Sequence, residues 1–456
     1  MQPQYDRSCG RLPFTFMLLL MAASFPCMSA TIELPDIFPA DLDEQTSLQA
    51  TDQAFANKLN AASRLIASGD YRQAISALKQ LRNDHPGSMH ACYLLSVSHV
   101  GLRHWSEALA VADECIAIEE NWPVIYSLKG AILAGMDRKE QALVQYDHMI
   151  ELDPDDPSGY RQRAKAYYVY FSDDRSALSQ AKDDLDRHVA LGGRPEKATA
   201  LYGILYAKLH RHQEAISHLV AALDNEPGHF EALRTLLDLY REQKQFDAAD
   251  ALFENALNNR ALFDQRQISE LYLAQAHTAQ AKNSPASAEA SFRASLKAMP
   301  ENLQARKAFI HWLDRQARLK ETIPLAREGL KIRPDEAYFT AYLAWALAAT
   351  AQDLSQAKKW LLKAKQQDPE NVFLSDTEAW IHVREGRYRK ALRTIQPSLE
   401  YAGKLPEIAY HAGVIHYHLG NPARAADYWR LSLEQETLFQ GRKDAKALLH
   451  KVNQER

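Results

Sequence analysis

The sequence of 456 residues is poor in cysteine, with four, and holds only 17 glycines and 19 prolines. So few glycines and prolines exclude a collagen-like or low-complexity chain. Positive and negative charges nearly balance, at a formal net charge of -4, and neither sign gathers into a block. The charge pattern therefore indicates neither nucleic-acid binding nor a solvated acidic tail.

Long hydrophobic runs are absent apart from one near the N-terminus. Two arginines precede an apolar run of twelve residues, 14–25, and small residues up to Ala30 follow it. This order is typical of a secretory signal peptide, and so short a run cannot span a bilayer. We expect residues 1–30 to be a signal peptide that is removed on export to the periplasm. The alternative is an uncleaved inner-membrane anchor; the residues before Cys27 do not favour lipid attachment.

Known catalytic motifs are also absent. The sequence has no His-Glu-x-x-His, no Gly-x-Ser-x-Gly and no phosphate-binding glycine loop. Histidines gather within 210–218 and within 411–418, but neither group has two at i and i+4, the spacing that would favour a metal site on one helix. Solvated histidines are the favoured interpretation. We expect no enzymatic activity, no cofactor and no metal.

A period of 34 residues runs through most of the chain instead. An alanine recurs at this interval, and in several units a proline follows it by twelve residues, as Pro154 follows Ala142. Thr322 fills the one vacant place, so eleven units lie in phase within residues 55–437. Such a period predicts a stack of helical repeats rather than a globular domain. The alanines are Ala74, Ala108, Ala142, Ala181, Ala215, Ala249, Ala288, Ala357, Ala391 and Ala425.

Each unit is predicted to be a hairpin of two helices, A and B. In the first unit, helix A covers 55–67 and helix B covers 71–82, with Gly69 between them and Pro86 after them. Glycine ends a helix in the left-handed conformation, and proline ends one because it lacks a backbone N–H. The repeated alanine marks the closest approach of the two helices. Two units carry five extra residues, expected between their helices near 172–175 and 283–285.

The pattern of small residue, aromatic, alanine and proline resembles the tetratricopeptide repeat. The turns Gly69–Ala74 and Gly386–Ala391 match the family's inter-helix turn. The resemblance implies an all-α, right-handed superhelical solenoid of about eleven helical hairpins. Residues 31–54 are expected to form an extended leader, and residues 438–456 a C-terminal capping helix.

The two cysteines beyond residue 30 fall in the second unit. Cys92 lies early in its helix A and Cys115 late in its helix B, positions that an antiparallel hairpin brings side by side. A disulfide could therefore staple this hairpin, although two cysteines do not make a disulfide scaffold. The alternative is that both are small buried residues at packing positions.

The resemblance implies that the A helices line a concave wall that receives a partner. Residues expected to face this wall are charged in the middle units and aromatic in the last ones. An aromatic strip favours a binding groove, whereas the alternative is that the rings pack as ordinary core. The predicted partner-binding residues are Arg161, Lys165, Arg234, Asp238, Arg241, Lys307 and His311, followed by Tyr338, Trp345, Phe373, Trp380, Tyr410 and Tyr417.

We expect a non-catalytic periplasmic scaffold that binds a protein or peptide in its concave groove. As the resemblance implies, such a scaffold would serve envelope assembly or export, in polysaccharide, pilus or cytochrome biogenesis. The alternative is a glycan-handling module of a polysaccharide export system, because aromatic strips can stack on sugar rings. No nucleic-acid partner and no membrane span after signal cleavage are expected.

Overall fold

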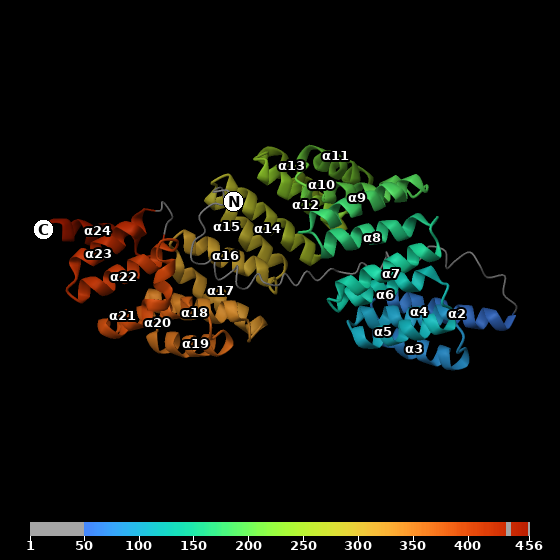
Figure 1. The fold of residues 1–456 in the computed structure, drawn as a ribbon, viewed down its shortest axis with the longest axis horizontal. Helices are drawn as coiled ribbons and strands as arrows, with labels where there is room; N and C mark the ends of the chain where they lie inside the picture. Colours follow the sequence, from blue (N-terminus) through green and yellow to red (C-terminus); the bar gives the residue numbers. More distant parts are fainter. Residues whose placement is uncertain (1–49, 435–438, 455–456) are drawn as a thin grey trace, which may run out of the picture. The chain divides into compact units, whose positions relative to one another are not determined.

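The computed structural model describes residues 50–434 and 439–454, and this part of the chain is helical with no strand (Figure 1). Twenty-three α-helices follow one another from α2 to α24. The all-α prediction is confirmed. The predicted signal peptide and most of the leader lie outside the described residues. Within the described residues, no helix is both long and apolar enough to cross a membrane.

The helices pair as antiparallel hairpins in chain order, from α2 with α3 to α22 with α23 (Figure 1). This gives eleven hairpins, and α24 packs on the last of them. The first helix of each hairpin is its A helix and the second its B helix. The predicted solenoid of helical hairpins is therefore present.

The chain divides into two compact units between Ala256 and Leu257. Helices of the first unit are α2 (Ala50–Ala67), α3 (Tyr71–Asp84), α4 (Met89–Gly101), α5 (Trp105–Ile118), α6 (Pro123–Gly135), α7 (Lys139–Leu152), α8 (Pro157–Tyr170), α9 (Arg175–Ala190), α10 (Pro195–Lys208), α11 (His212–Asn225), α12 (Phe230–Glu242) and α13 (Phe246–Asn258), whose last turn crosses the division.

The second unit begins with a short 3-10 helix and ends with the capping helix. Its helices are η3 (Arg260–Leu262), α14 (Gln265–Ala281), α15 (Pro285–Ala298), α16 (Leu303–Arg315), α17 (Leu319–Ile332), α18 (Ala337–Thr350), α19 (Leu354–Gln367), α20 (Phe373–Arg384), α21 (Tyr388–Ile395), η4 (Gln396–Tyr401), α22 (Pro406–His418), α23 (Pro422–Leu433) and α24 (Arg442–Gln454).

Small residues hold the two helices of each hairpin together. The ten repeated alanines and Thr322 are at most 1% exposed, as their period predicts. On the facing A helices, a Cβ on Gly130 would lie 2.8 Å from the Tyr146 ring, and one on Gly203 would lie 2.6 Å from Leu219. A larger residue at either glycine would push the helices apart.

The turns inside ten of the eleven hairpins use a left-handed residue at nearly the same place, the turn between α8 and α9 being the exception. Gly69, Gly386 and Gly420 adopt positive φ there, where glycine has no steric penalty. Seven other turns place a residue with a side chain in this conformation, which costs free energy because its Cβ crowds the backbone. They are Arg103, Asp137, His210, Lys244, Asn283, Ala317 and Ala351.

The two longer units place their extra residues differently from the prediction. In the fourth hairpin the turn between α8 and α9 gains one residue over the usual three, and both helices are longer than their counterparts in the preceding hairpin. In the seventh, the turn keeps three residues, 282–284, and the extra length lies before and within α14, which has 17 residues. Helix propagation is favourable once a helix has begun, so extra residues extend it.

Successive A helices also contact one another inside each unit, for example α10 with α12 and α18 with α20. The A helices therefore form an inner layer that B helices cover. The capping helix α24 buries Ala445 and Val452 and leaves polar residues such as Lys446 exposed.

Candidate functional site

The six predicted aromatic residues lie in pairs on the A helices α18, α20 and α22. Five of them are between 1% and 7% exposed, and the sixth, Tyr417, is half-buried with its ring centroid 5.6 Å from that of Trp429. The expectation of an exposed aromatic strip is wrong, and the core-packing alternative describes these rings. The glycan alternative loses the surface on which it depended. The five buried residues are Tyr338, Trp345, Phe373, Trp380 and Tyr410.

The sequence of α18 explains this burial. Every residue from Tyr338 to Ala349 is buried, and the helix contains no charged side chain. A helix that is apolar all round is stable only when it is covered on all sides. This all-round apolar character is visible in the sequence and could have predicted the burial.

A buried hydrogen-bonded pair, His411 with Asp376, lies against two of these rings. The Nδ1 atom of His411 on α22 lies 2.9 Å from the Asp376 carboxylate on α20, and both side chains are at most 1% exposed. The Trp380 ring stacks on His411 at 4.0 Å between centroids, and Trp345 lies 5.4 Å from the same ring. The sequence prediction missed Asp376 and took His411 as solvated. Their separation of 35 residues, close to one repeat, was the available signal.

Glu407 lies in the first turn of the same helix, four residues before His411. Burial, with smaller contributions from the charges of Asp314 and Asp376, raises the pKa of its carboxyl from 4.5 to about 8. Burial also raises the pKa of the Tyr338 hydroxyl, and Asp314 adds to that shift. The Oε2 atom of Glu407, the Oη of Tyr338 and the Nε1 of Trp380 are enclosed without a hydrogen-bond partner.

The charged residues predicted in the first unit lie on the A helices α8 and α12, where one of the five is exposed and four are half-buried. Arg161 and Lys165 on α8 are half-buried and have contacts of their own. Arg234 on α12 is exposed, and Arg241 pairs with Asp238 at 2.7 Å. Spacings of three and four residues place these side chains on one face of each helix.

A second charged network in this unit was not predicted. The guanidinium of Arg163 on α8 donates to Asp184 on α9 at 2.6 and 2.9 Å and to Asp147 on α7 at 2.8 Å. These bonds hold the pKa of Arg163 above its ordinary value against the effect of burial. Arg163 thus ties three helices together next to the predicted Arg161.

The two predicted residues of α16 are already engaged in the fold. Lys307 pairs with Glu336 at 2.7 Å and lies over the Tyr338 ring. Burial, helped by the charge of Arg315 and by His277, lowers the pKa of His311 to about 4. His311 is therefore neutral at physiological pH and cannot act as a cation there.

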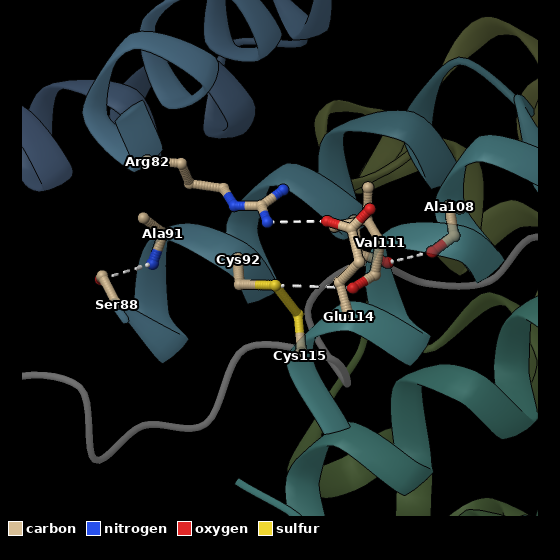
Figure 2. Close-up of a disulfide and its surroundings, with 9 residues drawn as sticks. Arg82, Ser88, Ala91, Cys92, Ala108, Val111, Glu114 and Cys115 are labelled. Atoms are coloured by element: carbon tan, nitrogen blue, oxygen red, sulfur yellow. Dashed lines mark hydrogen bonds and ion pairs between the residues drawn. A yellow bond between two sulfur atoms is a disulfide. The ribbon is translucent and has the colours of Figure 1, made fainter. Parts of the chain in front are cut away.

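Cys92 and Cys115 form a disulfide between α4 and α5 (Figure 2). Their Cα atoms are 5.7 Å apart, and both residues are fully buried. Close by, Arg82 of α3 pairs with Glu114 at 2.7 Å, which links the preceding hairpin to the stapled one (Figure 2). Of the two alternatives left open for the cysteines, the structure shows the disulfide.

Comparison with known families gives three matches along the chain. Profiles described as tetratricopeptide repeat match residues 65–132, 201–262 and 377–436. The chain is a tetratricopeptide repeat protein. A search of curated proteins finds no match.

Solved structures, among them tetratricopeptide repeat proteins, resemble this one at low sequence identity. A protein from Parabacteroides merdae is 15% identical, with a TM-score of 0.44 over 56% of this chain and 97% of that one. The Cut9–Hcn1 hetero-tetramer of the APC/C gives 13% identity and a TM-score of 0.41 over 88% and 84%. A thermophilic protein from Thermus thermophilus gives 21% and 0.34 over 39% and 94%.

Tetratricopeptide repeats suggest a scaffold for protein–protein interaction, and the family is typically non-catalytic. In this tetratricopeptide repeat protein, the described residues contain no group of three or more His, Cys, Asp or Glu that could hold a metal ion. The histidines of 411–418 have other roles: His416 stacks on Tyr428 and His418 on Tyr388.

Proposed function

We propose that this tetratricopeptide repeat protein is a non-catalytic periplasmic scaffold that holds a protein or peptide segment against the A helices of its first unit. The observation that carries the proposal is the charged face of α8 and α12. There the half-buried Arg161 and the exposed Arg234 offer positive charge to a polar partner. In the second unit the expected wall residues are buried or half-buried and engaged in the fold. A face that is partly open and charged attracts a partner and fixes its orientation.

The disulfide supports the location outside the cytoplasm. Disulfides persist in oxidising compartments and are rare where thiols are kept reduced. The Cys92–Cys115 bond and the signal-like N-terminal sequence both support export of the protein from the cytoplasm. We place the scaffold in envelope assembly or export, in the biogenesis of a surface polysaccharide, a pilus or a cytochrome.

Site-specific photo-crosslinking in living cells tests the proposal. A photoreactive amino acid replaces Arg234 on α12, and in a matched strain it replaces Lys79, which is exposed on the B helix α3. We expect a discrete protein adduct in the periplasmic fraction from position 234 and none from position 79. Adducts from position 79 alone, or adducts found only in the cytoplasm, would contradict the proposal.

A further inference from the structure

A pocket with a volume of about 310 Å³ lies in the first unit, between the helices α5, α6 and α7. Leu133 of α6 is buried and Val144 of α7 is 57% exposed, so the lining runs from the core to the surface. Lys129 of α6 pairs with Asp113 of α5 at 2.8 Å. A pocket of this size is small for a ligand site and suits a single side chain. The lining residues are Leu109, Asp113, Lys129, Leu133, Arg138, Gln141, Val144 and Gln145.

The equivalent place in the fifth hairpin is filled by two tyrosine rings. Tyr206 of α10 stands 73 residues after Leu133, the interval that also separates the repeated alanines of the third and fifth hairpins. Tyr202 stands the same number of residues after Lys129. The two rings stack at 6.1 Å between centroids, and each lies 5.4 Å from the His218 ring of α11. The third hairpin has no ring at either position, and the smaller side chain of Leu133 leaves space there.

An arginine directly before the B helix lies beside this place in both hairpins. In the fifth hairpin, the guanidinium of Arg211 lies 4.6 Å from the centre of the Tyr206 ring and pairs with Glu214 at 2.5 Å. In the third, Arg138 lines the pocket and donates to the neutral amide of Gln141, which takes the place of the glutamate. This bond does not neutralise the charge of Arg138. The pocket therefore has room for an aromatic ring beside a cation, an arrangement that attracts the two groups to each other.

The leader of the same chain carries a side chain of this kind. Residues 31–49 contain a single aromatic residue, Phe38, and no lysine or arginine. This segment also contains five acids, which are Glu33, Asp36, Asp41, Asp43 and Glu44. It thus offers a ring to a pocket that lacks one and negative charge to Arg138. Such electrostatic complementarity fixes the orientation of a bound segment.

The leader is long enough to reach the pocket. It joins α2 at Ala50, and the A helices α2, α4 and α6 contact one another in order. Packed helices lie about 8 to 10 Å apart, which places α6 about 20 Å from α2. The 18 residues of α2 make it about 27 Å long. Twelve residues separate Phe38 from Ala50 and span up to about 40 Å, so the pocket is within reach even from the far end of α2.

We propose that Phe38 of the leader docks in the pocket between α5, α6 and α7 of its own chain. Its ring takes the place that Tyr206 fills in the fifth hairpin, with the guanidinium of Arg138 over it. Asp36, two residues earlier, supplies the negative charge that Gln141 does not. The inference goes beyond the proposed function and does not rest on it, because the proposed partner lies on α8 and α12.

Fluorescence anisotropy of a labelled peptide with the sequence of residues 31–49 tests the inference on the purified protein. A Phe38→Ser protein cannot fill its own pocket and should bind the peptide. The wild type should bind it at least about tenfold more weakly, because its tethered leader competes at a high effective concentration. A peptide that itself carries Phe38→Ser should bind neither protein, because the aromatic anchor is lost.

Two matched substitutions in the Phe38→Ser protein locate the site. Val144→Glu places a negative charge in the pocket, and Val220→Glu places the same charge at another exposed valine, on the B helix α11. We expect the first to weaken peptide binding by about tenfold or more and the second to leave it unchanged. Both melting temperatures should stay close to that of the parent protein, because both valines are exposed.

A photoreactive amino acid at position 38 shows whose leader occupies the pocket. Mass spectrometry should find links to the lining residues within one chain, and Val144→Glu should remove them. Links between two chains only, or links that survive Val144→Glu, would overturn the inference. Equal binding of the peptide to the wild type and to every variant would overturn it as well. None of these results concerns the adduct at position 234, so the proposed function is tested separately.

Discussion

At the scale of single residues, Glu407 shows how burial disfavours the charged form of a carboxyl group and raises its pKa. Its Oε2 atom is enclosed, and the carboxylates of Asp314 and Asp376 raise its pKa further, to about 8 from 4.5. Between these two pH values the folded state holds a proton that the unfolded state has released. Stability should therefore fall as pH rises through this window.

The substitution Glu407→Gln should flatten this pH dependence. We expect the advantage of the variant over the wild type to grow by about 3–4 kcal/mol between pH 5 and pH 8, because the amide never ionises. Thermal or urea unfolding at the two pH values measures the difference. Glu370→Gln, at an exposed acid, serves as the control. Parallel pH profiles for wild type and Glu407→Gln would show that the carboxyl ionises normally.

Left-handed turn residues give a second prediction at this scale. Ala351 ends α18 with φ at 52°, a conformation that glycine adopts without penalty. Ala351→Gly should therefore stabilise the protein by about 0.5–1 kcal/mol, after the entropy of the unfolded glycine is counted. Ala447→Gly, at an exposed position inside α24, should instead destabilise by about 1 kcal/mol. Urea unfolding measures the free energy of unfolding of both variants, which should rise for Ala351→Gly and fall for Ala447→Gly. A fall for both variants would refute the turn argument.

At the scale of the helix, the main finding is that the aromatic rings of α18, α20 and α22 hold the inner layer together. Trp380 makes ring contacts to Tyr410 at 5.7 Å and to His411 at 4.0 Å, both on the next A helix. Removing such a ring leaves a cavity between two helices. Its effect should thus appear in stability before it appears in binding.

We expect Trp380→Ala to cost about 3–5 kcal/mol. Trp360 on α19 is half-exposed, so Trp360→Ala should cost far less and is the control for loss of an indole in the same unit. Differential scanning calorimetry compares the two. Similar melting temperatures for both variants would mean that Trp380 is a surface residue, as an exposed strip requires.

The disulfide acts on one hairpin, α4 with α5. It closes a loop with a sequence separation of 23, for which restriction of the unfolded chain contributes about 3 kcal/mol. Reductant should therefore lower the melting temperature of the wild type. The melting temperature of a Cys92→Ala/Cys115→Ala variant should not change. Mass spectrometry of an unreduced digest should link the two cysteine peptides. Recovery of both as free thiols would refute the bond.

Much of the arrangement of helices in hairpins was predictable from the sequence. The alanine period located eleven hairpins, because the closest helix contact admits only small residues wherever it recurs. The positive φ of Arg103 and Asp137 follows from the same period, since they stand 34 and 68 residues after Gly69. The all-round apolar sequence of α18 could have predicted the burial of Trp345. The burial of Trp380 was not predictable from spacing, because it depends on how closely successive A helices approach. The hydrogen bond between Asp376 and His411 was not predictable for the same reason, because it joins two successive A helices.

At the scale of the whole molecule, the two units use their A helices differently. The first unit presents Arg234 at an exposed position, whereas the second unit buries the aromatic residues of its A helices. A stack of hairpins lets each repeat vary its inner residues without changing the fold, since stability comes mainly from neighbouring contacts. The central claim is that the A helices of the first unit receive a partner.

Hydrogen–deuterium exchange of the protein alone and with the partner captured at position 234 tests that claim most directly. The account predicts slower exchange at the ends and exposed turns of α8 and α12 in the complex, with α9 and α13 unchanged, because the partner lies on the A-helix face. Protection confined to the B helices α9 and α13, with α8 and α12 unaffected, would contradict it.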